Sequence, residues 1–344
     1  MLTTNIVMEM GYAGDLQLGA LIATGVVLLI FILIINALTS LASGGKKDKN
    51  CKKRSIEPLA KFFHIIKIEK IGKVVAFVSA GIAVLGLLSI LVFVSVKGIP
   101  HLSAQLLFGK YSVRNVSILP SVVATLLTVL ISLIVAAPIG VFTAVFLNEY
   151  TKKGSKAVKV IRTAIDILSG IPSIVYALFG MVTFVVWLGG KQSILAGSLT
   201  IAIMLLPTVV RSTEESLKSV PDGLREGSLA LGAGKVRTVF KVVLPSALPG
   251  IASAIILAMG RVVSESAPFI YTMGNSLKGM PAGVTDSGTT LAVALYRLAG
   301  EGRFVNQAYA TAFVLIVVVL SLNAVADLIT KKLDKKLKGS KDGK

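Results

Sequence analysis

The chain has 344 residues, of which 54% are hydrophobic and only 15% are charged, and its mean hydropathy is +0.83. This composition excludes an ordinary soluble domain, in which about 25% of residues are charged. The net charge of +19 does not require nucleic acid, because Lys and Arg gather on the cytoplasmic side of membrane proteins and attract anionic lipid headgroups there.

Apolar runs long enough to cross a hydrocarbon layer of about 30 Å recur along the chain. The run that begins at Leu16 follows Glu9 and Asp15 without any Lys or Arg, so we predict a true span rather than a signal peptide. The sequence therefore predicts an all-α, polytopic membrane protein with its N-terminus outside. Its predicted spans are Leu16–Leu41, Val74–Val96, Ile118–Leu147, Ile167–Leu188, Ile194–Val210, Ala247–Ile270 and Ala308–Ile329.

The orientation follows from the cations. Segments 46–73, 152–162, 211–241 and 331–344 alternate with the opposite set of loops and hold 28 of the 36 Lys and Arg residues. Because cations are retained on the cytoplasmic side, these segments and the C-terminus are predicted to be cytoplasmic.

Four parts of the chain are predicted from this pattern. Residues 1–55 form an N-terminal span and a basic cytoplasmic loop, and residues 56–73 mix aromatic and aliphatic residues with lysine as an interfacial helix does. Residues 74–330 form the transmembrane domain, and residues 331–344 form a basic cytoplasmic tail.

Several kinds of catalytic site are excluded. Cys51 stands alone in a basic loop, and His64 and His101 lack the spacing of metal ligands, so no metal site is predicted. The pattern G-x-x-x-x-G-K-[ST] does not occur, so the chain is predicted not to bind ATP through a P-loop. We expect no cofactor on this chain and no enzymatic activity of its own.

Segment 211–245 is the longest polar interlude between predicted spans. Ser219 and Pro221 signal a helix start, and the glycines of "GAG" (Gly232–Gly234) signal its end. The following "KVRTVFKVVLP" alternates cations with apolar residues, which predicts a second short amphipathic helix that ends at Pro245. Two short helices jointed at glycine would offer a platform to another protein.

This segment resembles the EAA loop of the permease subunits of ABC importers. Glu226 matches the acid of that pattern, Gly232 its glycine, and Leu244 and Pro245 its ending, while Gly227 and Ser228 stand in place of two alanines. The resemblance implies that these residues dock a partner ATPase.

The likeness extends over roughly Ile118 to the last span. "GIPSIVYALFG", "LLPTVVRSTEESLKSVPDGLREGSLALGAGK" and "GRVVSESAPFIYT" resemble the phosphate-specific ABC permeases, most of all the PstA type. This implies a six-helix permease core plus one additional N-terminal transmembrane helix. It also implies a homologous permease subunit, a dimer of ATPase subunits that use ATP and Mg, and an extracytoplasmic phosphate-binding protein as partners. The chain would be the transmembrane permease subunit of an ATP-driven phosphate importer in the plasma (inner) membrane.

Two charges deep in an apolar run point to the transport pathway. Arg261 and Glu265 lie four residues apart, so on a helix they would share a face and neutralise one another. A structural pair that only faces a neighbouring helix is one interpretation. The other is that the planar guanidinium of Arg261 attracts phosphate in transit while Glu265 limits its hold, since a structural site would be served by apolar residues.

A second charged group lies at the end of the fifth predicted span. Arg211, with Glu214 and Glu215 one turn on, is interpreted as a solvated interfacial cluster, with a gating role as the alternative. Asp166 is expected to pair with Arg162 along one helix.

Two other functions remain open. An ABC permease for another oxyanion, such as molybdate or sulfate, would have the same features, because the binding protein usually selects the ligand. A secondary transporter or channel that needs no ATPase would leave segment 211–245 without a purpose.

Overall fold

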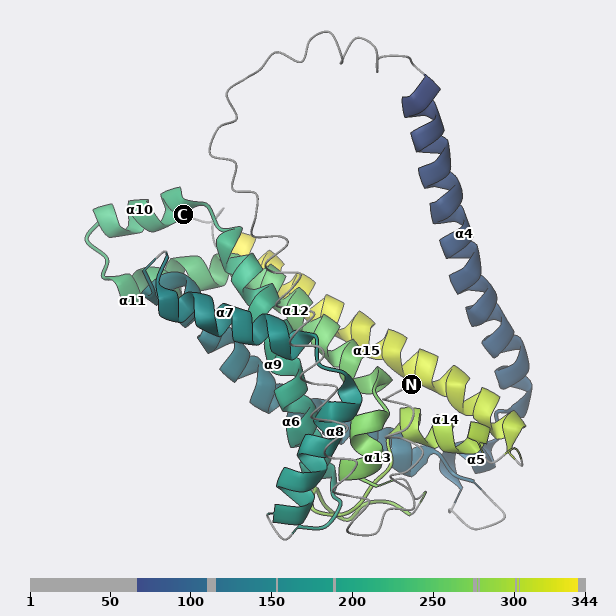
Figure 1. Ribbon diagram of the computed structural model, residues 1–344. Coiled ribbons are helices and arrows are strands. Elements are labelled where there is room, and N and C mark those ends of the chain that lie inside the picture. Colours follow the sequence, from purple (N-terminus) through teal and green to yellow (C-terminus); the bar gives the residue numbers. More distant parts are fainter. Residues whose placement is uncertain are drawn as a thin grey trace.

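The computed structural model describes residues 67–109, 116–152, 154–187, 190–274, 277, 279–300, 302 and 304–339. In these ranges every regular element is helical (Figure 1). In chain order they are α4 (Lys67–Gly98), the 3-10 turn η1 (Ile99–His101), α5 (Ala104–Phe108), α6 (Leu119–Val145), the π-helical turn η2 (Phe146–Tyr150), α7 (Lys156–Ser169), α8 (Ser173–Gly180), the π-helical η3 (Met181–Trp187), α9 (Ile194–Lys218), α10 (Asp222–Ala230), α11 (Lys235–Thr238), the π-helical η4 (Val239–Val243), α12 (Leu244–Ser264), α13 (Ala267–Thr272), α14 (Leu291–Gly300) and α15 (Val305–Gly339).

The predicted all-α membrane architecture is confirmed. Five helical stretches in the described ranges are long and apolar enough to cross a membrane, and the bent pair α7 and α8–η3 passes the same test as a unit. The predicted span Leu16–Leu41 and the rest of residues 1–55 lie outside the described residues. The five stretches are Val74–His101, Leu119–Tyr150, Ile194–Lys218, Lys235–Ser264 and Val305–Lys332.

Two predicted boundaries are replaced by continuous helix. Residues 67–73, expected to belong to a separate interfacial helix, run into α4 without a break, and residues 56–66 lie outside the described part. At the other end, α15 continues through the first part of the predicted tail as far as Gly339.

The apolar stretch predicted as one span over Ile167–Leu188 is not one continuous helix. Helix α7 ends at Ser169, and the chain turns by 98° before α8 begins at Ser173. Pro172 has extended backbone angles (φ −61°, ψ 145°). Its ring fixes φ and removes a hydrogen-bond donor, and it also disfavours helical angles at the preceding residue, so the helix cannot continue through it.

Helices α6, α9 and α12 form the centre of the bundle. Buried side chains from all three share one apolar cluster, which also takes in Tyr176 of α8 and Phe269 of α13. Small residues permit close approach of the helices, as is usual in membranes. Polar groups cross between elements as well: the Ser132 hydroxyl donates to the Ser198 carbonyl at 3.1 Å, and the Leu291 N–H donates to the Thr125 hydroxyl at 2.9 Å.

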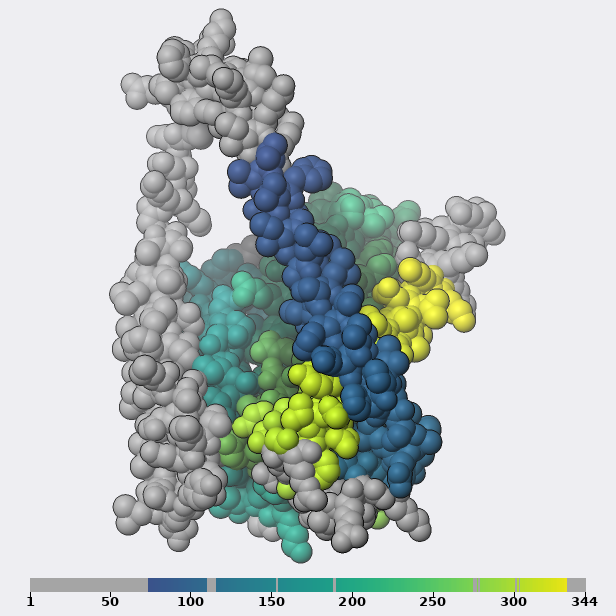
Figure 2. All heavy atoms as spheres, turned by 90° about the vertical axis from the view of Figure 1, so that its right-hand side faces the viewer, coloured from purple at the N-terminus to yellow at the C-terminus, as the bar shows by residue number. Residues whose placement is uncertain are grey.

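Helix α4 stands at the outside of this bundle. It meets α15 near one end, where the rings of Phe93 and Tyr309 pack edge to face with centroids 5.8 Å apart. Gly98 permits the contact, because a Cβ there would lie 2.6 Å from the Tyr309 carbonyl oxygen. Away from this end α4 diverges from α15 (Figure 1). It runs over one face of the molecule (Figure 2), and its apolar side chains are exposed.

Helix α10 and the start of α11 lie at one end of the bundle, opposite to α5, α13 and α14 (Figure 1). We call this the basic end, because η2, α7, the end of α9, α10 and α11 meet there and carry many cations. They are Lys152, Lys156, Lys159, Arg162, Arg211, Lys218, Arg225, Lys235, Arg237 and Lys241.

The break between α10 and α11 is confirmed at the predicted glycine. Gly232 has a φ of +83°, which residues with a Cβ rarely adopt. The Ala233 N–H donates to the Ser228 carbonyl at 3.1 Å, and the Gly232 N–H donates to the Leu229 carbonyl at 2.9 Å. This is the Schellman motif, which satisfies the last carbonyls of α10.

The predicted end of the second helix at Pro245 is wrong. Helix α11, η4 and α12 follow one another without interruption, so that Lys235–Ser264 is one helical stretch. Pro245 lies in the first turn of α12, directly after the π-helical turn η4. The wider turn relieves the clash that the proline ring would make with the preceding carbonyl groups.

The packing of α6 on α9 generates a first prediction. An added Cβ at Gly140 would lie 2.6 Å from Val209 Cγ1, so Gly140→Val should force the two helices apart. Overpacking of this kind costs about 1–3 kcal/mol, and we expect a lower midpoint of thermal unfolding in detergent. Gly86→Val in α4 is the matched control, because nothing lies within 4 Å of a Cβ there. Equal midpoints for the two variants would contradict the packing.

The turn at Gly232 generates a second prediction. Gly232→Ala should destabilise the α10 end by about 1–2 kcal/mol, the penalty for a Cβ in the left-handed region. Gly227→Ala, inside α10, should stabilise the helix by up to about 1 kcal/mol. Neither site has an atom within 4 Å of the added Cβ, so the backbone decides. Amide hydrogen exchange across α10 should therefore become faster in the first variant and slower in the second; the same direction in both would refute the assignment.

Candidate functional site

Arg261 and Glu265 are brought together as predicted. The Arg261 Nε lies 3.5 Å from Glu265 Oε1, and the two side chains are 38% and 19% exposed. Their helical context differs from the prediction, because the span Ala247–Ile270 is not continuous. Helix α12 ends at Ser264, Glu265 has extended backbone angles (φ −78°, ψ 141°), and α13 starts at Ala267.

A proline accounts for this interruption. Pro268 lies in the first turn of α13, and its missing N–H cannot continue the hydrogen-bond ladder of α12. Interrupted helices within a membrane bundle are the places where transporters often bind their substrates. The pair Arg261–Glu265 therefore lies at the break between α12 and α13 rather than in the middle of a regular helix.

Arg261 also contacts α9. Its Nη1 donates to the Thr208 hydroxyl at 3.4 Å, next to Pro207. Sequence reasoning did not find Thr208, since a threonine inside an apolar run carries no signal of its own. Both contacts of Arg261 among the described residues are long, and a guanidinium has five donors. Its capacity to bind an oxyanion is thus largely available.

The interpretation of Arg211, Glu214 and Glu215 as a solvated cluster is wrong for Glu214. Helix α9 continues past these residues to Lys218, and the Glu214 side chain is only 8% exposed. Its carboxylate forms ion pairs with Arg162 of α7 and, at 3.0 Å, with Lys218. Glu215 is exposed, as expected.

The spacing of Asp166 and Arg162 predicted an ion pair between them. Asp166 instead pairs with Arg211 of α9 at 3.1 Å. Helix α7 lies against α9, so partners across the two helices replace partners along one. These crossed ion pairs fasten α7 to α9 at the basic end. The Arg211–Asp166 pair is more than half exposed, so its contribution to stability is small.

The residues predicted to contact an ATPase divide into two groups. Glu226 and Gly227 of α10 and Gly232 after it are exposed, and the Ser228 hydroxyl lies 2.9 Å from the Thr238 hydroxyl of α11. Leu244 and Pro245 instead begin α12 and are partly buried. The structure thus brings Glu226, Gly227, Ser228 and Gly232 together. Leu244 and Pro245 lie apart from them, in the first turn of the span α12.

Large apolar side chains are exposed on α10, the turn after it, α11 and η4. Leu231 is 90% exposed, and we call the group the α10–α11 surface. This surface lies on a polar segment at the basic end, where contact with the hydrocarbon layer is not expected. Exposed apolar patches of this kind mark protein interaction sites. Its other members are Leu224, Leu229, Val236 and Phe240.

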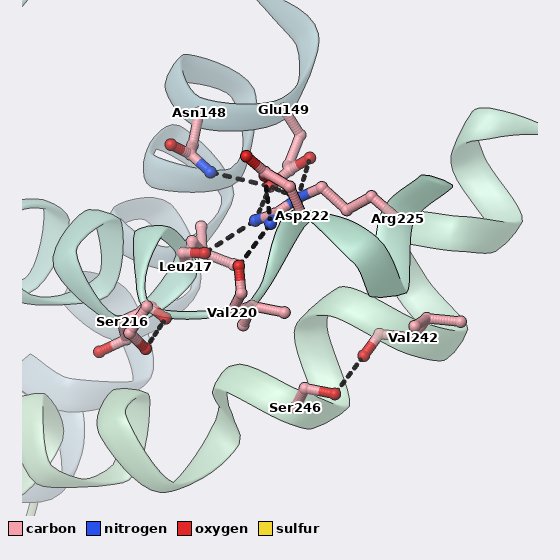
Figure 3. A network of polar contacts seen from close by, with 10 residues as sticks. Asn148, Glu149, Ser216, Leu217, Val220, Asp222, Arg225, Val242 and Ser246 are labelled. Atoms are coloured by element: carbon pink, nitrogen blue, oxygen red, sulfur yellow. Dashed lines mark hydrogen bonds and ion pairs between the residues drawn. The ribbon is translucent and has the colours of Figure 1, made fainter. Parts of the chain in front are cut away.

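An ionic network missed by sequence reasoning fastens α10 to the bundle (Figure 3). The Arg225 Nη2 donates to Glu149 Oε1 of η2 at 2.9 Å, and Asn148 Nδ2 donates to the same oxygen at 2.8 Å. Arg225 also donates to the carbonyls of Leu217 at 2.8 Å and Val220 at 2.7 Å. No sequence signal joins Arg225 to Glu149, which are 76 residues apart.

Among the described residues, no three or more His, Cys, Asp or Glu side chains lie close enough together to hold a metal ion. The residues that the structure does bring forward are a partly buried guanidinium within the bundle and an exposed apolar surface at the basic end.

Comparison with known proteins places this arrangement in a family. Residues 136–339 match the family described as binding-protein-dependent transport system inner membrane component. The chain is 32% identical over 262 residues to the probable ABC transporter permease protein YqgI of Bacillus subtilis (strain 168), which covers 71% of this chain and 89% of that protein.

A second relative carries a more specific name. Over 152 residues the chain is 43% identical to the phosphate transport system permease protein PstA of Mycobacterium leprae (strain TN). This match covers 44% of the chain and 49% of the relative, so it spans about half the length of that mycobacterial protein.

A solved structure with the same fold is that of a bacterial alginate ABC transporter in complex with an alginate pentasaccharide-bound periplasmic protein. One of its chains has a TM-score of 0.59 at 16% identity, over 78% of this chain and 97% of that chain. This likeness concerns the fold alone. Since the family match covers more than half of the sequence and the Bacillus relative is covered almost completely, the chain belongs to the binding-protein-dependent transport system inner membrane components, as an ABC transporter permease of the PstA type.

Proposed function

We propose that this chain is one of two homologous permease subunits that form the pathway of an ATP-driven phosphate importer. The observation that carries the proposal is the α10–α11 surface, an exposed apolar patch around Glu226 at the basic end of a permease fold. The phosphate cargo is supported by the similarity to a protein named as a phosphate transport system permease.

The basic end faces the cytoplasm in this proposal, because Lys and Arg are retained on that side of the plasma (inner) membrane. The C-terminus then lies in the cytoplasm and the N-terminus outside. The end that carries α5, α13 and α14 faces outward, where a phosphate-binding protein delivers the anion.

The α10–α11 surface binds one subunit of an ATPase dimer. Interfaces depend on a few buried apolar anchors within a polar rim, and Leu231 beside the Gly232 turn has the exposure of such an anchor. Glu226 supplies a charge on the same helix. The partner binds and hydrolyses ATP with Mg²⁺, and its movements reach the spans through α10 and through the continuous helix Lys235–Ser264.

Arg261 attracts phosphate within the pathway. Its guanidinium can present two parallel donors to the oxygens of a phosphate, and its contacts to Thr208 and Glu265 are long enough to be exchanged for stronger ones. Glu265 holds the side chain in place and repels an anion that lingers. This arrangement favours passage over tight binding.

The ATPase contact can be tested by purification. Glu226→Lys and Leu231→Asp should each weaken retention of the ATPase by about tenfold or more, as changes at interface anchors do. The complex would be isolated in mild detergent and its ATPase content measured by quantitative immunoblot. Asp327→Lys makes the same charge change on an exposed position of α15 and should leave the ATPase content unchanged. Full retention in the first two variants would argue against this surface.

The pathway can be tested by transport. Arg261→Gln should reduce phosphate uptake by reconstituted vesicles about 10–100-fold, which corresponds to the loss of a charged hydrogen bond. Arg261→Lys keeps the charge without the fork and should recover part of the rate. Wild-type uptake by a normally assembled Arg261→Gln complex would exclude the role of Arg261.

The cargo is decided with the unchanged complex. ATP hydrolysis in the presence of the binding protein should be stimulated by phosphate and not by sulfate or molybdate. Stimulation by one of the latter would assign another oxyanion, and uptake by this chain alone in sealed vesicles would remove the need for an ATPase altogether.

A further inference from the structure

Helix α10 lies against α11 and η4 and buries none of its own residues. Its leucines Leu224 and Leu229 are exposed, so polar contacts supply much of its attachment to the bundle. At its C-terminal half the Ser228 hydroxyl meets Thr238 of α11. At its N-terminal half the side chain of Arg225 makes the polar contacts to other elements.

Arg225 uses all of its donor groups. Its Nε faces Glu149, its Nη2 donates to Glu149 and to the Leu217 carbonyl, and its Nη1 donates to the Val220 carbonyl and to Asp222. A guanidinium has five N–H donors in a fixed plane, and these five contacts account for them. Because these donors point in fixed directions, the side chain restrains the orientation of α10 relative to its partners.

Three elements meet at this arginine (Figure 3). Glu149 belongs to η2, which continues span α6, while the Leu217 carbonyl belongs to the last turn of α9. The guanidinium therefore also lies where the α9 macrodipole favours a cation. A second contact supports the same junction, because Lys235 Nζ of α11 lies 5.5 Å from the centre of the Tyr150 ring of η2.

The two carboxylate partners of Arg225 differ in how far their side chains are exposed to solvent. The Arg225 and Glu149 side chains are 16% and 8% exposed, whereas Asp222 is 74% exposed. An exposed pair contributes little, but removal of one member of a buried pair is costly. Glu149, Asp222 and Arg225 line a cavity of about 560 Å³ at this junction. Because this space is not filled by side chains, apolar packing there cannot substitute for the ionic contact.

We propose that Arg225 and Glu149 are positioning residues of the transporter, which fix α10 to the ends of spans α6 and α9 so that movement of a bound ATPase reaches both spans. The proposal rests on the proposed function. In this proposal the pair affects how much phosphate is transported per ATP hydrolysed. It does not affect the binding of the ATPase or of phosphate.

The test measures this ratio in the full reconstituted complex with its binding protein. Arg225→Gln and Glu149→Gln should each lower the phosphate transported per ATP hydrolysed by about fivefold or more, and the double variant should be no worse than either single one, because the two act as a unit. Asp222→Asn, which alters the exposed contact of the same arginine, is the matched control and should keep the wild-type ratio.

Arg225→Lys provides a second variant that retains the charge. A lysine cannot reach Glu149 and both carbonyls at once, so the ratio should fall between those of the wild type and Arg225→Gln. All ratios are measured on complexes with equal ATPase content; if Arg225→Gln does not assemble, Arg225→Lys decides. Wild-type ratios in the assembled variants, or effects of the two single changes that multiply in the double variant, would overturn the proposal.

These outcomes are distinct from a failure of the proposed function. A wild-type complex that hydrolyses ATP but takes up no phosphate would contradict the cargo. A wild-type complex that imports phosphate while the variants remain fully coupled would contradict the positioning role alone.

Discussion

Backbone hydrogen bonding inside a hydrocarbon layer is the constraint on which the rest of this structure depends. No water is available there, so each segment that crosses must satisfy its own N–H and C=O groups as a helix, and an interruption is tolerated where protein surrounds it. The described part of the chain agrees with this rule: α8 and α13, which follow the breaks at Pro172 and before Pro268, pack against each other and against α9. Pro245 needs no break, because a π-helical turn before it relaxes the backbone. The break beside Arg261 is thus also the place where a charge can be held among the spans.

The basic end is organised by ion pairs that join different helices. Arg162 and Lys218 neutralise the buried Glu214, Arg211 meets Asp166, and Arg225 meets Glu149. Exposed surface pairs contribute little to stability, but the side chains of Glu214 and Glu149 are each only 8% exposed and have cations directed at them. The cations that set topology in the sequence therefore have a second use, since several of them also determine how the short helices sit on the spans.

The spans were predictable because long apolar runs leave few alternatives in a chain of this composition, and the turn at Gly232 was predictable because few residues other than glycine adopt its backbone angles. The bend at Pro172 was missed because the apolar composition continues on both sides of it, although Gly170 and Pro172 marked the position. At Pro245 the prediction erred in the opposite direction, because a helix end was expected where the helix continues. Proline is permitted in the first turn of a helix as well as after its end. The pairing of Arg225 with Glu149 and the burial of Glu214 follow from the packing of segments distant in sequence, which one sequence does not contain. The Arg261–Glu265 pair was predictable from its spacing, but the contact of Arg261 with Thr208 was not.

Helix α4 has 32 residues, and its apolar part Val74–Val96 is about 35 Å long at 1.5 Å per residue, slightly more than the hydrocarbon thickness of about 30 Å. It is fastened to α15 near Phe93 and Gly98, while its other end has no neighbour among the described residues. A helix longer than the bilayer accommodates the difference by tilting. Because α4 contacts α15 near one end, we expect its tilt to respond to bilayer thickness more readily than that of the spans packed at the centre of the bundle.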